Sequence, residues 1–217
     1  MGYRENDPMG GYDPYSSSKG CSELITAAYR KSFFNSVDFK VHEKSLASAR
    51  AGNIIGGGDW QKDRIIPDCI RALESNKPIE IRNPKATRPW QHVLDPLSGY
   101  LLLASRMYKE SQKYCGAWNF GPNQDSIITV GKIADMIVAK WGRGSWIDKS
   151  DKSEPHEANL LSLDISKAKT YLKWSTVWDT ATTIEKTVEW YREYSRKDPY
   201  EICKSQINEY MKDTKIR

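Results

Sequence analysis

The sequence predicts an α/β fold with a mostly parallel sheet. Short apolar segments that favour strands, such as KSLASARA ending near Ala51 and GAWNFGP, alternate with longer segments whose apolar residues recur with a helical period. The chain has 217 residues, enough for one substantial core and too few for more than two ordinary domains. Alternating strands and helices favour parallel strands with right-handed crossovers, so the loops after the strands gather at one sheet edge, where ligands bind.

The composition excludes several classes of protein. Apolar residues make up 39% and charged residues 28%, and eight Trp and twelve Tyr are present, which indicates a globular chain rather than a disordered one. The net charge of +5 is spread along the chain without a basic run, so nucleic acid is not an expected partner. No apolar stretch approaches the roughly 18 residues of a membrane span.

The cysteines and histidines predict no metal site and no disulfide framework. The four cysteines lie far apart without a Cys-x-x-Cys pair, and three histidines accompany them. His92 is expected to be a structural residue that hydrogen-bonds to the backbone. The expected compartment is therefore the reducing cytoplasm.

The first predicted helix follows an opening segment rich in glycine and proline. Asp13 is a suitable N-cap and Pro14 suits the first helical position, so the helix is expected over about 15–34. The strand that ends near Ala51 breaks at Gly52 and leads into the glycine-rich GGGDW. A strand that feeds such a loop often carries a ligand.

The rest of the chain alternates in the same way. In order, the predicted elements are a helix from Arg64, a short strand in KPIEIRNP, a helix in HVLDPLSGYLLLASRMYKES, a strand in GAWNFGP, a helix in TVGKIADMIVAKWG capped by Thr129, and two helices over about 180–195 and 199–212. The last helix is amphipathic and is expected either to dock or to fray.

Tyr15 and Lys19 stand four residues apart at the start of the first predicted helix, which places them on the same face. A free tyrosine has a pKa of about 10 and becomes a useful base near neutrality only if something favours its phenolate. An ammonium group one turn away does so electrostatically. The spacing alone also fits an exposed tyrosine beside a solvated lysine.

The flanking segments support the catalytic interpretation. PYSSSKG, RAGNIIGGGDW, DRIIP, RPWQHVLD and NFGP follow one another along the chain. They resemble the active-site helix, the asparagine loop, the substrate loop, the Arg-aromatic-x-His-Val-x-Asp segment and the late strand of the extended short-chain dehydrogenase/reductases. The resemblance covers most of residues 3–195. Within that family, YRENDPMGGYDPYSSSKG and SEPHEANLLSLDISKAK are similar to segments of the nucleotide-sugar 4,6-dehydratases that act on CDP-glucose.

The resemblance implies the C-terminal part of an NAD(P)-binding Rossmann-like fold with a small α/β substrate-binding region. It implies NAD as the cofactor, CDP-glucose as the substrate and a carbon–oxygen lyase reaction that proceeds through an internal redox cycle. By position, Tyr15 is the base and Lys19 favours its phenolate and holds the nicotinamide ribose. Residues 1–53 are expected to belong to the Rossmann domain and 54–217 mainly to the sugar-binding region, with Rossmann elements returning at about 92–122. Family members usually form homodimers through the tyrosine-bearing helix.

The same resemblance assigns substrate contacts to four further residues. Arg88 matches a diphosphate-binding arginine, Arg64 a basic position of the substrate loop, and Asn53 the asparagine that contacts the sugar diphosphate. Guanidinium groups suit phosphate because they bind its oxygens in bidentate fashion. His156 matches a substrate-binding position, but Ala158 stands where relatives have an arginine, which weakens a phosphate role there. An ordinary surface role is the competing interpretation for the two arginines and the asparagine.

No glycine fingerprint for a dinucleotide or nucleotide phosphate is present in the sequence. Relatives carry it in an N-terminal half of on the order of 100 residues, so the chain is expected to be a C-terminal portion without the pyrophosphate cradle. Apolar edges and helix faces are then expected to be exposed, which predicts low solubility of the isolated chain. Two alternatives stay open: another nucleotide-sugar epimerase or reductase of the family, and a non-catalytic remnant that binds a nucleotide sugar or a partner chain.

Overall fold

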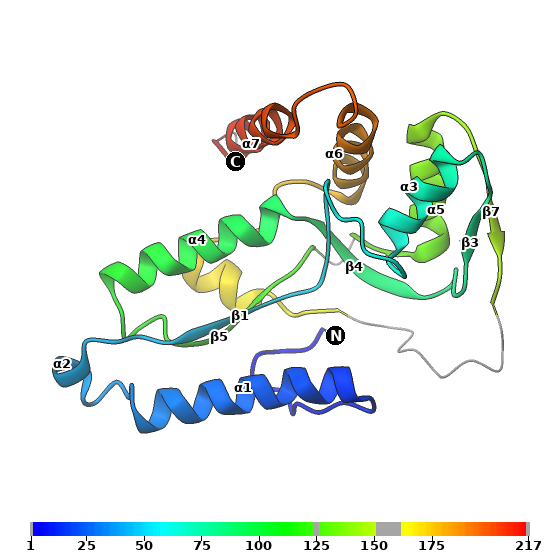
Figure 1. Cartoon of the computed structure of the whole chain (residues 1–217). Coiled ribbons are helices and arrows are strands. Elements are labelled where there is room, and N and C mark those ends of the chain that lie inside the picture. The colour runs from blue at the N-terminus through cyan, green and yellow to red at the C-terminus, as the bar shows by residue number, and fades with distance from the viewer. Residues whose placement is uncertain (1, 124–125, 151–161, 216–217) are drawn as a thin grey trace. The chain divides into compact units, whose positions relative to one another are not determined.

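The computed structural model describes residues 2–123, 126–150 and 162–215. The chain divides into two compact units, each of which mixes helices and strands (Figure 1). Unit 1 comprises Met1–Ala51, Leu97–Phe120 and Leu163–Trp174, and unit 2 comprises Gly52–Pro96, Gly121–Ser162 and Ser175–Arg217. Within the described ranges, no helix is both long and apolar enough to cross a membrane.

Unit 1 is built around two parallel strands. Its elements are α1 (Pro14–Ser32), α2 (Phe39–His42), β1 (Ala47–Ala51), most of α4 (Leu94–Lys109), β5 (Gly116–Phe120) and a π-helix (Ala168–Leu172). β1 pairs with β5 in parallel, from Ala47 opposite Gly116 to Ala51 opposite Phe120. Figure 1 shows α1 on one side of this pair and α4 with the π-helix on the other. The predicted parallel pairing is confirmed here.

The core of unit 1 lies on the α4 side of the strand pair. It consists of Leu103, Tyr114, Trp118, Phe120, Ile165, Ala168, Leu172 and Trp174. The Phe120 ring packs edge-on against Trp174, with the ring centroids 5.0 Å apart. A Cβ atom on Gly99 would lie 2.4 Å from this ring, so α4 needs a glycine here to approach β5. In contrast, α1 contributes no buried side chain to the unit.

Unit 2 contains two small sheets covered by helices. Its strands are β2 (Asn53–Ile55), β3 (Ile79–Ile81), β4 (Thr87–His92), β6 (Ile127–Thr129) and β7 (Trp146–Asp148), and its helices are α3 (Ile65–Glu74), α5 (Val130–Trp141), α6 (Thr180–Glu193) and α7 (Pro199–Lys215). One sheet has the order β2-β4-β6, with β2 parallel and β6 antiparallel to β4. The other pairs β3 with β7 in parallel. A single apolar cluster joins α3, α5, α6 and the strands between them.

The segment around β4 differs from the sequence prediction. A helix was expected from His92, but His92 is the last residue of β4 and α4 begins at Leu94. The strand contains Pro89 and several polar residues, which local propensity disfavours. Hydrogen bonding to β2 and β6 compensates for this low strand propensity. Both partner strands come from other parts of the chain, so the local sequence does not indicate them.

The predicted helix caps are confirmed. Asp13 is the N-cap of α1, and its carboxylate accepts a hydrogen bond from the Ser16 N–H at 3.0 Å, with Pro14 in the first turn. Thr129 caps α5 by accepting from the Lys132 N–H at 3.2 Å. These caps act within one turn, which is why the sequence alone predicts them.

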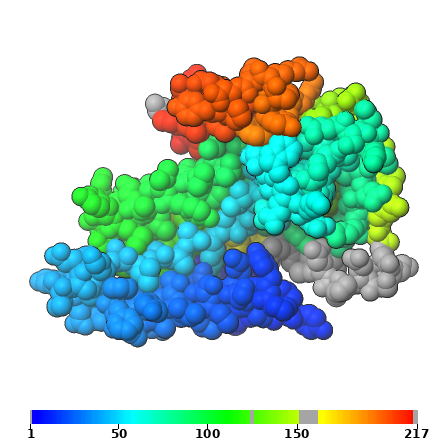
Figure 2. All heavy atoms as spheres, in the orientation of Figure 1, coloured from blue at the N-terminus to red at the C-terminus, as the bar shows by residue number. Residues whose placement is uncertain are grey.

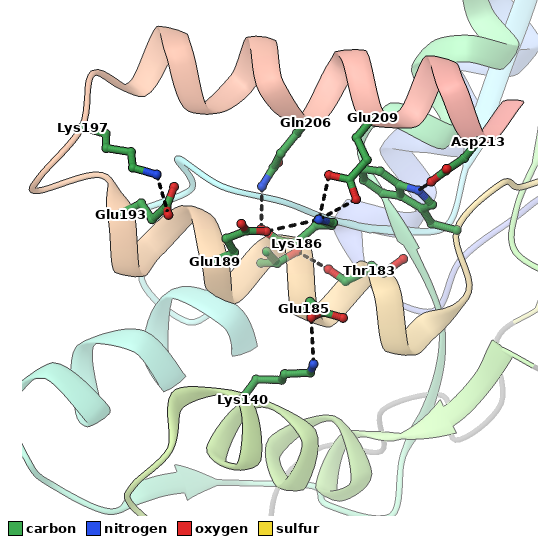
Figure 3. Close-up of polar contacts among 12 residues, drawn as sticks. Lys140, Thr183, Glu185, Lys186, Glu189, Glu193, Lys197, Gln206, Glu209 and Asp213 are labelled. Carbon is green, nitrogen blue, oxygen red and sulfur yellow. Dashed lines mark hydrogen bonds and ion pairs between the residues drawn. The ribbon is translucent and has the colours of Figure 1, made fainter.

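The last helix docks on α6 instead of fraying. Lys186 of α6 lies between Glu189 and Glu209, and its Nζ is 2.7 Å from Oε1 of Glu209 (Figure 3). Gln206 of α7 donates a hydrogen bond to the Lys186 carbonyl at 2.8 Å. Ile202 is buried in the same interface. The alternative of a docked helix is thereby confirmed.

Candidate functional site

Tyr15 and Lys19 form a close pair at the start of α1. Nζ of Lys19 lies 5.4 Å from the centroid of the Tyr15 ring, within the range of a cation–π contact. Tyr15 is 72% exposed. The structure therefore brings the two predicted residues together, in a position that a ligand can reach.

The turn before α1 depends on a glycine. The Ser17 hydroxyl donates to the Gly11 carbonyl at 3.0 Å, which holds residues 9–11 against the helix start. A Cβ atom on Gly11 would lie 2.0 Å from Oγ of Ser16, so no other residue fits without a shift. The pKa of Asp13 is lowered, first by the hydrogen bond from the Ser16 side chain and then by the Ser16 N–H. The Asp13 carboxylate is therefore charged near neutrality and stabilises the end of the helix that carries Tyr15.

Asn53 and Arg88 lie on neighbouring strands of unit 2. Asn53 opens β2 and stands opposite Trp90, so Arg88 is two residues earlier on β4. The Arg88 guanidinium donates to the Thr87 carbonyl at 2.9 Å and is half-buried. Two of the three predicted substrate residues that the structure describes therefore share one small sheet.

Arg64 immediately precedes α3 and is more exposed to solvent than Arg88. Its Nη1 lies 3.2 Å from Oδ2 of Asp59, and its side chain is 58% exposed. A surface ion pair of this kind contributes about 0–1 kcal/mol, so an anionic ligand can compete for the guanidinium. His156 lies outside the described residues.

The glycine-rich loop at 56–58 has a packing role. The indole of Trp190 lies so close that a Cβ atom on Gly57 would be 2.0 Å from its Cγ. Gly58 has a φ of +82°, a conformation that favours glycine. The Tyr191 hydroxyl donates to the Asp59 carbonyl at 2.5 Å and holds the end of the loop. Sequence reasoning offered these glycines as part of a ligand loop, whereas Gly57 is explained by the contact with α6 and Gly58 by its backbone conformation.

Three polar residues that join α1 to β1 escaped the sequence analysis. Glu23 of α1 accepts hydrogen bonds from Ser48 and Arg50 of β1, at 2.7 and 2.8 Å. Two signals were available. Glu23 continues the spacing of four residues from Tyr15 and Lys19, and Arg50 is the one charged residue in the small-residue strand ASARA.

Comparison with known sequences identifies the family. The sequence profile of the NAD dependent epimerase/dehydratase family matches residues 2–119, more than half of the chain. The chain belongs to this family. Within the NAD dependent epimerase/dehydratases, it is 50% identical over 215 residues to a CDP-glucose 4,6-dehydratase of Salmonella typhimurium. That match covers 98% of this chain and 60% of the relative, so the chain spans less than two thirds of the relative's length.

Solved structures of other epimerases and dehydratases share the fold. A dTDP-glucose 4,6-dehydratase of Bacillus anthracis, in complex with NAD, aligns with a TM-score of 0.72 at 19% identity and covers 89% of this chain and 56% of that protein. A dTDP-glucose 4,6-dehydratase of Streptomyces venezuelae aligns with a TM-score of 0.70 at 20% identity over 89% of this chain and 55% of its own. These likenesses confirm the predicted α/β fold, which the chain shares with these dehydratases.

Proposed function

We propose that this chain provides the Tyr15–Lys19 helix and the nucleotide-sugar-binding region of a CDP-glucose 4,6-dehydratase. The reaction removes water from CDP-D-glucose and gives CDP-4-dehydro-6-deoxy-D-glucose. The 50% identity to the Salmonella relative supports this substrate. The observation that carries the chemistry is the exposed tyrosine with an ammonium group 5.4 Å from its ring.

In this proposal, Tyr15 acts as the general base. Its phenolate oxygen takes the proton of the sugar 4-hydroxyl, which leaves C4 ready to lose hydride. The Lys19 ammonium stabilises the negative charge on the phenolate and donates to a hydroxyl of the nicotinamide ribose. NAD, when bound, supplies the hydride acceptor at C4 and the hydride donor at C6.

Tyr15 and Lys19 fit the ribose end of NAD because an open phenol and an open ammonium group offer hydrogen bonds to its hydroxyls. The loop at 56–58 does not fit the pyrophosphate, because Trp190 packs directly against Gly57. Within the described residues, this chain therefore supplies one end of a cofactor site.

Arg88, Arg64 and Asn53 are proposed to bind the sugar diphosphate, and His156 is kept as a fourth substrate-binding residue. Arg64 can exchange its weak surface partner Asp59 for a phosphate oxygen. Asn53 and Arg88 come from adjacent strands, so both can face one ligand without a change in the sheet.

We assign residues 1–53 to the cofactor domain and 54–217 mainly to the sugar-binding region, with cofactor-domain elements returning at about 92–122. The cytoplasm is the proposed compartment, since all four cysteines are free thiols. A homodimer formed through α1 is the proposed assembly of the complete enzyme. Its support is the exposed apolar surface of that helix.

A reconstitution assay tests the chemistry. The chain is combined with the segment of the Salmonella relative that it does not cover, NAD and CDP-glucose, and mass spectrometry follows the product. We expect a 4-keto sugar, and we expect Tyr15→Phe to slow its formation by about 10²- to 10⁴-fold, the range typical for loss of a general base. Tyr12→Phe is the matched control, because Tyr12 is a fully exposed tyrosine three residues earlier.

Other products point to the alternatives. An epimerised CDP-sugar with no 4-keto product indicates an epimerase of the same family. Binding of CDP-glucose with no turnover indicates a non-catalytic remnant. Either result contradicts the proposed dehydratase.

A further inference from the structure

The helix that carries Tyr15 and Lys19 is held to its unit by a narrow surface. None of its 19 residues is buried. The half-buried positions are Ser16, Ser17, Gly20, Glu23, Thr26, Ala27 and Arg30, most of which follow one another every three or four residues and so form one face. Apolar packing on this face is slight, because Ala27 is its one apolar side chain with a Cβ. The orientation of α1 must therefore depend on polar contacts.

Glu23 lies in the middle of that face and makes the contact with the strands. Its Oε2 accepts from the Ser48 hydroxyl at 2.7 Å and from Nη2 of Arg50 at 2.8 Å. The Glu23 and Arg50 side chains are 19% and 20% exposed, so the pair is largely shielded from water. Among the described residues, no other α1 side chain hydrogen-bonds to β1.

Arg50 is itself fixed from the other side. Its Nη1 donates to the Glu5 carbonyl at 3.2 Å, and the Glu5 carboxylate accepts from the Asn119 N–H of β5 at 3.0 Å. Asn119 stands opposite Arg50 in the parallel pair. The guanidinium is thus a rigid anchor that belongs to the strands, and Glu23 is the group through which α1 attaches to it.

The charge state of Glu23 agrees with this role. The hydrogen bond from Arg50 holds the pKa of Glu23 below its usual value, against the opposing effect of burial, and Ser48 adds to the lowering. Glu23 is therefore ionised near neutrality. Removal of one partner from such a shielded pair leaves the other charge poorly solvated, which is costly.

We infer that Glu23, anchored by Arg50 and Ser48, is a positioning residue for Tyr15 and Lys19; this inference rests on the proposed function. The three α1 residues follow one another every four positions, and each step turns by about 40° around the helix axis. A contact that fixes the direction of Glu23 therefore fixes the direction of the other two. Reaction rates are sensitive to the placement of catalytic groups, since a shift of about 1 Å in such a group can lower the rate by up to about 10²-fold.

The first experiment needs no activity. Hydrogen exchange of the α1 amides is measured in the full chain for the wild type and for Glu23→Gln. We expect at least tenfold faster exchange over residues 18–27 in the variant, because α1 opens locally when its anchor is lost. Ser48→Ala removes one hydrogen bond and no charge, so it is expected to give a smaller increase in the exchange rate of the same amides. Because this change is milder, Ser48→Ala is expected to fold even if Glu23→Gln does not.

The control for this experiment is Glu209→Gln. It removes an ion pair of similar length, Lys186 to Glu209 at 2.7 Å, from unit 2. We expect no change in exchange over residues 18–27. Equal exchange in wild type, Glu23→Gln and Ser48→Ala would overturn the inference.

The second experiment separates positioning from general stability. In the reconstituted dehydratase, Glu23→Gln is expected to lower kcat by tenfold or more with KM for CDP-glucose within twofold of the wild type. In a Tyr15→Phe background, the same substitution is expected to have a much smaller effect on kcat, because the general base that Glu23 positions is gone and only the placement of Lys19 can still be disturbed. An equal loss in both backgrounds, or a rise in KM alone, would contradict a positioning role.

Failure of the proposed function has a different signature. If no 4-keto sugar forms with any variant, the dehydratase proposal fails and the exchange experiment alone decides the inference. If turnover is found and depends on Tyr15, but Glu23→Gln changes neither the amide exchange nor kcat, the positioning inference fails and the proposed function stands.

Discussion

His92 is a buried imidazole that the structure keeps neutral. Its Nδ1 accepts a hydrogen bond from the Leu94 N–H at 3.3 Å, so the neutral ring carries its proton on Nε2. The ring packs against Trp178, with the centroids 4.7 Å apart. Burial, together with the nearby charge of Lys186, lowers the pKa of His92 to about 4. The interpretation of His92 as a structural residue agrees with these contacts.

The low pKa of His92 makes the stability of the protein depend on pH. The unfolded chain binds a proton at this residue below about pH 6.5, whereas the folded chain does so only near pH 4. The contribution of neutral His92 to the free energy of unfolding is therefore complete above about pH 6.5. Roughly 3 kcal/mol of it is lost as the pH falls to 4. In equilibrium unfolding, His92→Gln is expected to flatten this part of the pH dependence.

The control for the His92 experiment is Tyr200→Phe. This variant replaces an exposed aromatic residue on α7 and leaves all three histidines in place. We expect the wild-type slope between pH 6.5 and 4. Parallel curves for wild type and His92→Gln would contradict the prediction.

α7 is held against the rest of unit 2 by side chains spread along the length of the helix. Ile202 and Tyr210 are buried, and the Trp178 indole donates a hydrogen bond to Asp213 at 2.8 Å. Burial and the Glu209 and Glu189 carboxylates have opposite effects on the pKa of Lys186, and the carboxylates prevail and raise it. The α6–α7 interface is therefore a combination of apolar contacts and shielded polar contacts.

Tyr210 connects α7 to a buried carboxylate. Its hydroxyl donates to Oδ1 of Asp95 at 2.8 Å, and the Val177 N–H donates to the same oxygen at 2.7 Å. Asp95 is fully buried, so the loss of one donor is not replaced by water. Tyr210→Phe is expected to lower the free energy of unfolding by about 1–3 kcal/mol, measured by denaturant titration.

Tyr200→Phe serves as the control on the same helix. Tyr200 is 67% exposed whereas Tyr210 is 6% exposed. We expect a change within about 0.5 kcal/mol, as for most surface substitutions. Equal stability of the two variants would show that the contact with Asp95 contributes nothing.

The whole chain combines two well-packed units with a large exposed apolar surface on α1. Leu24, Ile25, Tyr29 and Phe33 are each more than half exposed. Figure 2 shows the α1 atoms, in blue, open to solvent along the helix in this view. Monomeric soluble proteins rarely expose such a continuous patch, which usually marks an interface or an aggregation site.

We therefore expect the isolated chain to self-associate. Sedimentation should show a concentration-dependent increase in mass, and the double variant Leu24→Gln/Phe33→Gln should shift the chain toward the monomer. Glutamine is a good helix former, so α1 itself should persist. Tyr200→Gln, which removes a single exposed aromatic residue on α7, is the control and should leave the association unchanged. A monomeric wild type that unfolds cooperatively would contradict the prediction.

Much of the fold and the proximity of Tyr15 and Lys19 were predictable from local sequence. The Asp13 and Thr129 caps and the adjacency of Tyr15 and Lys19 all follow from contacts within a few residues along the chain. The family resemblance was equally readable, because its segments occur in a fixed order. Most helices were predicted for the same reason, since an amphipathic period of 3.6 is a property of the segment itself.

Only the tertiary structure decided where distant segments meet. β4 forms because β2 and β6 pair with it. Gly57 is required because Trp190 of α6 lies against it. Glu23 of α1 forms an ion pair with Arg50 of β1. Each of these contacts joins residues far apart in the sequence, and hydrophobic periodicity carries no information on which strand or helix lies opposite. The sequence determined the chemical groups of this protein, and the packing of its strands determined the direction in which those groups are held.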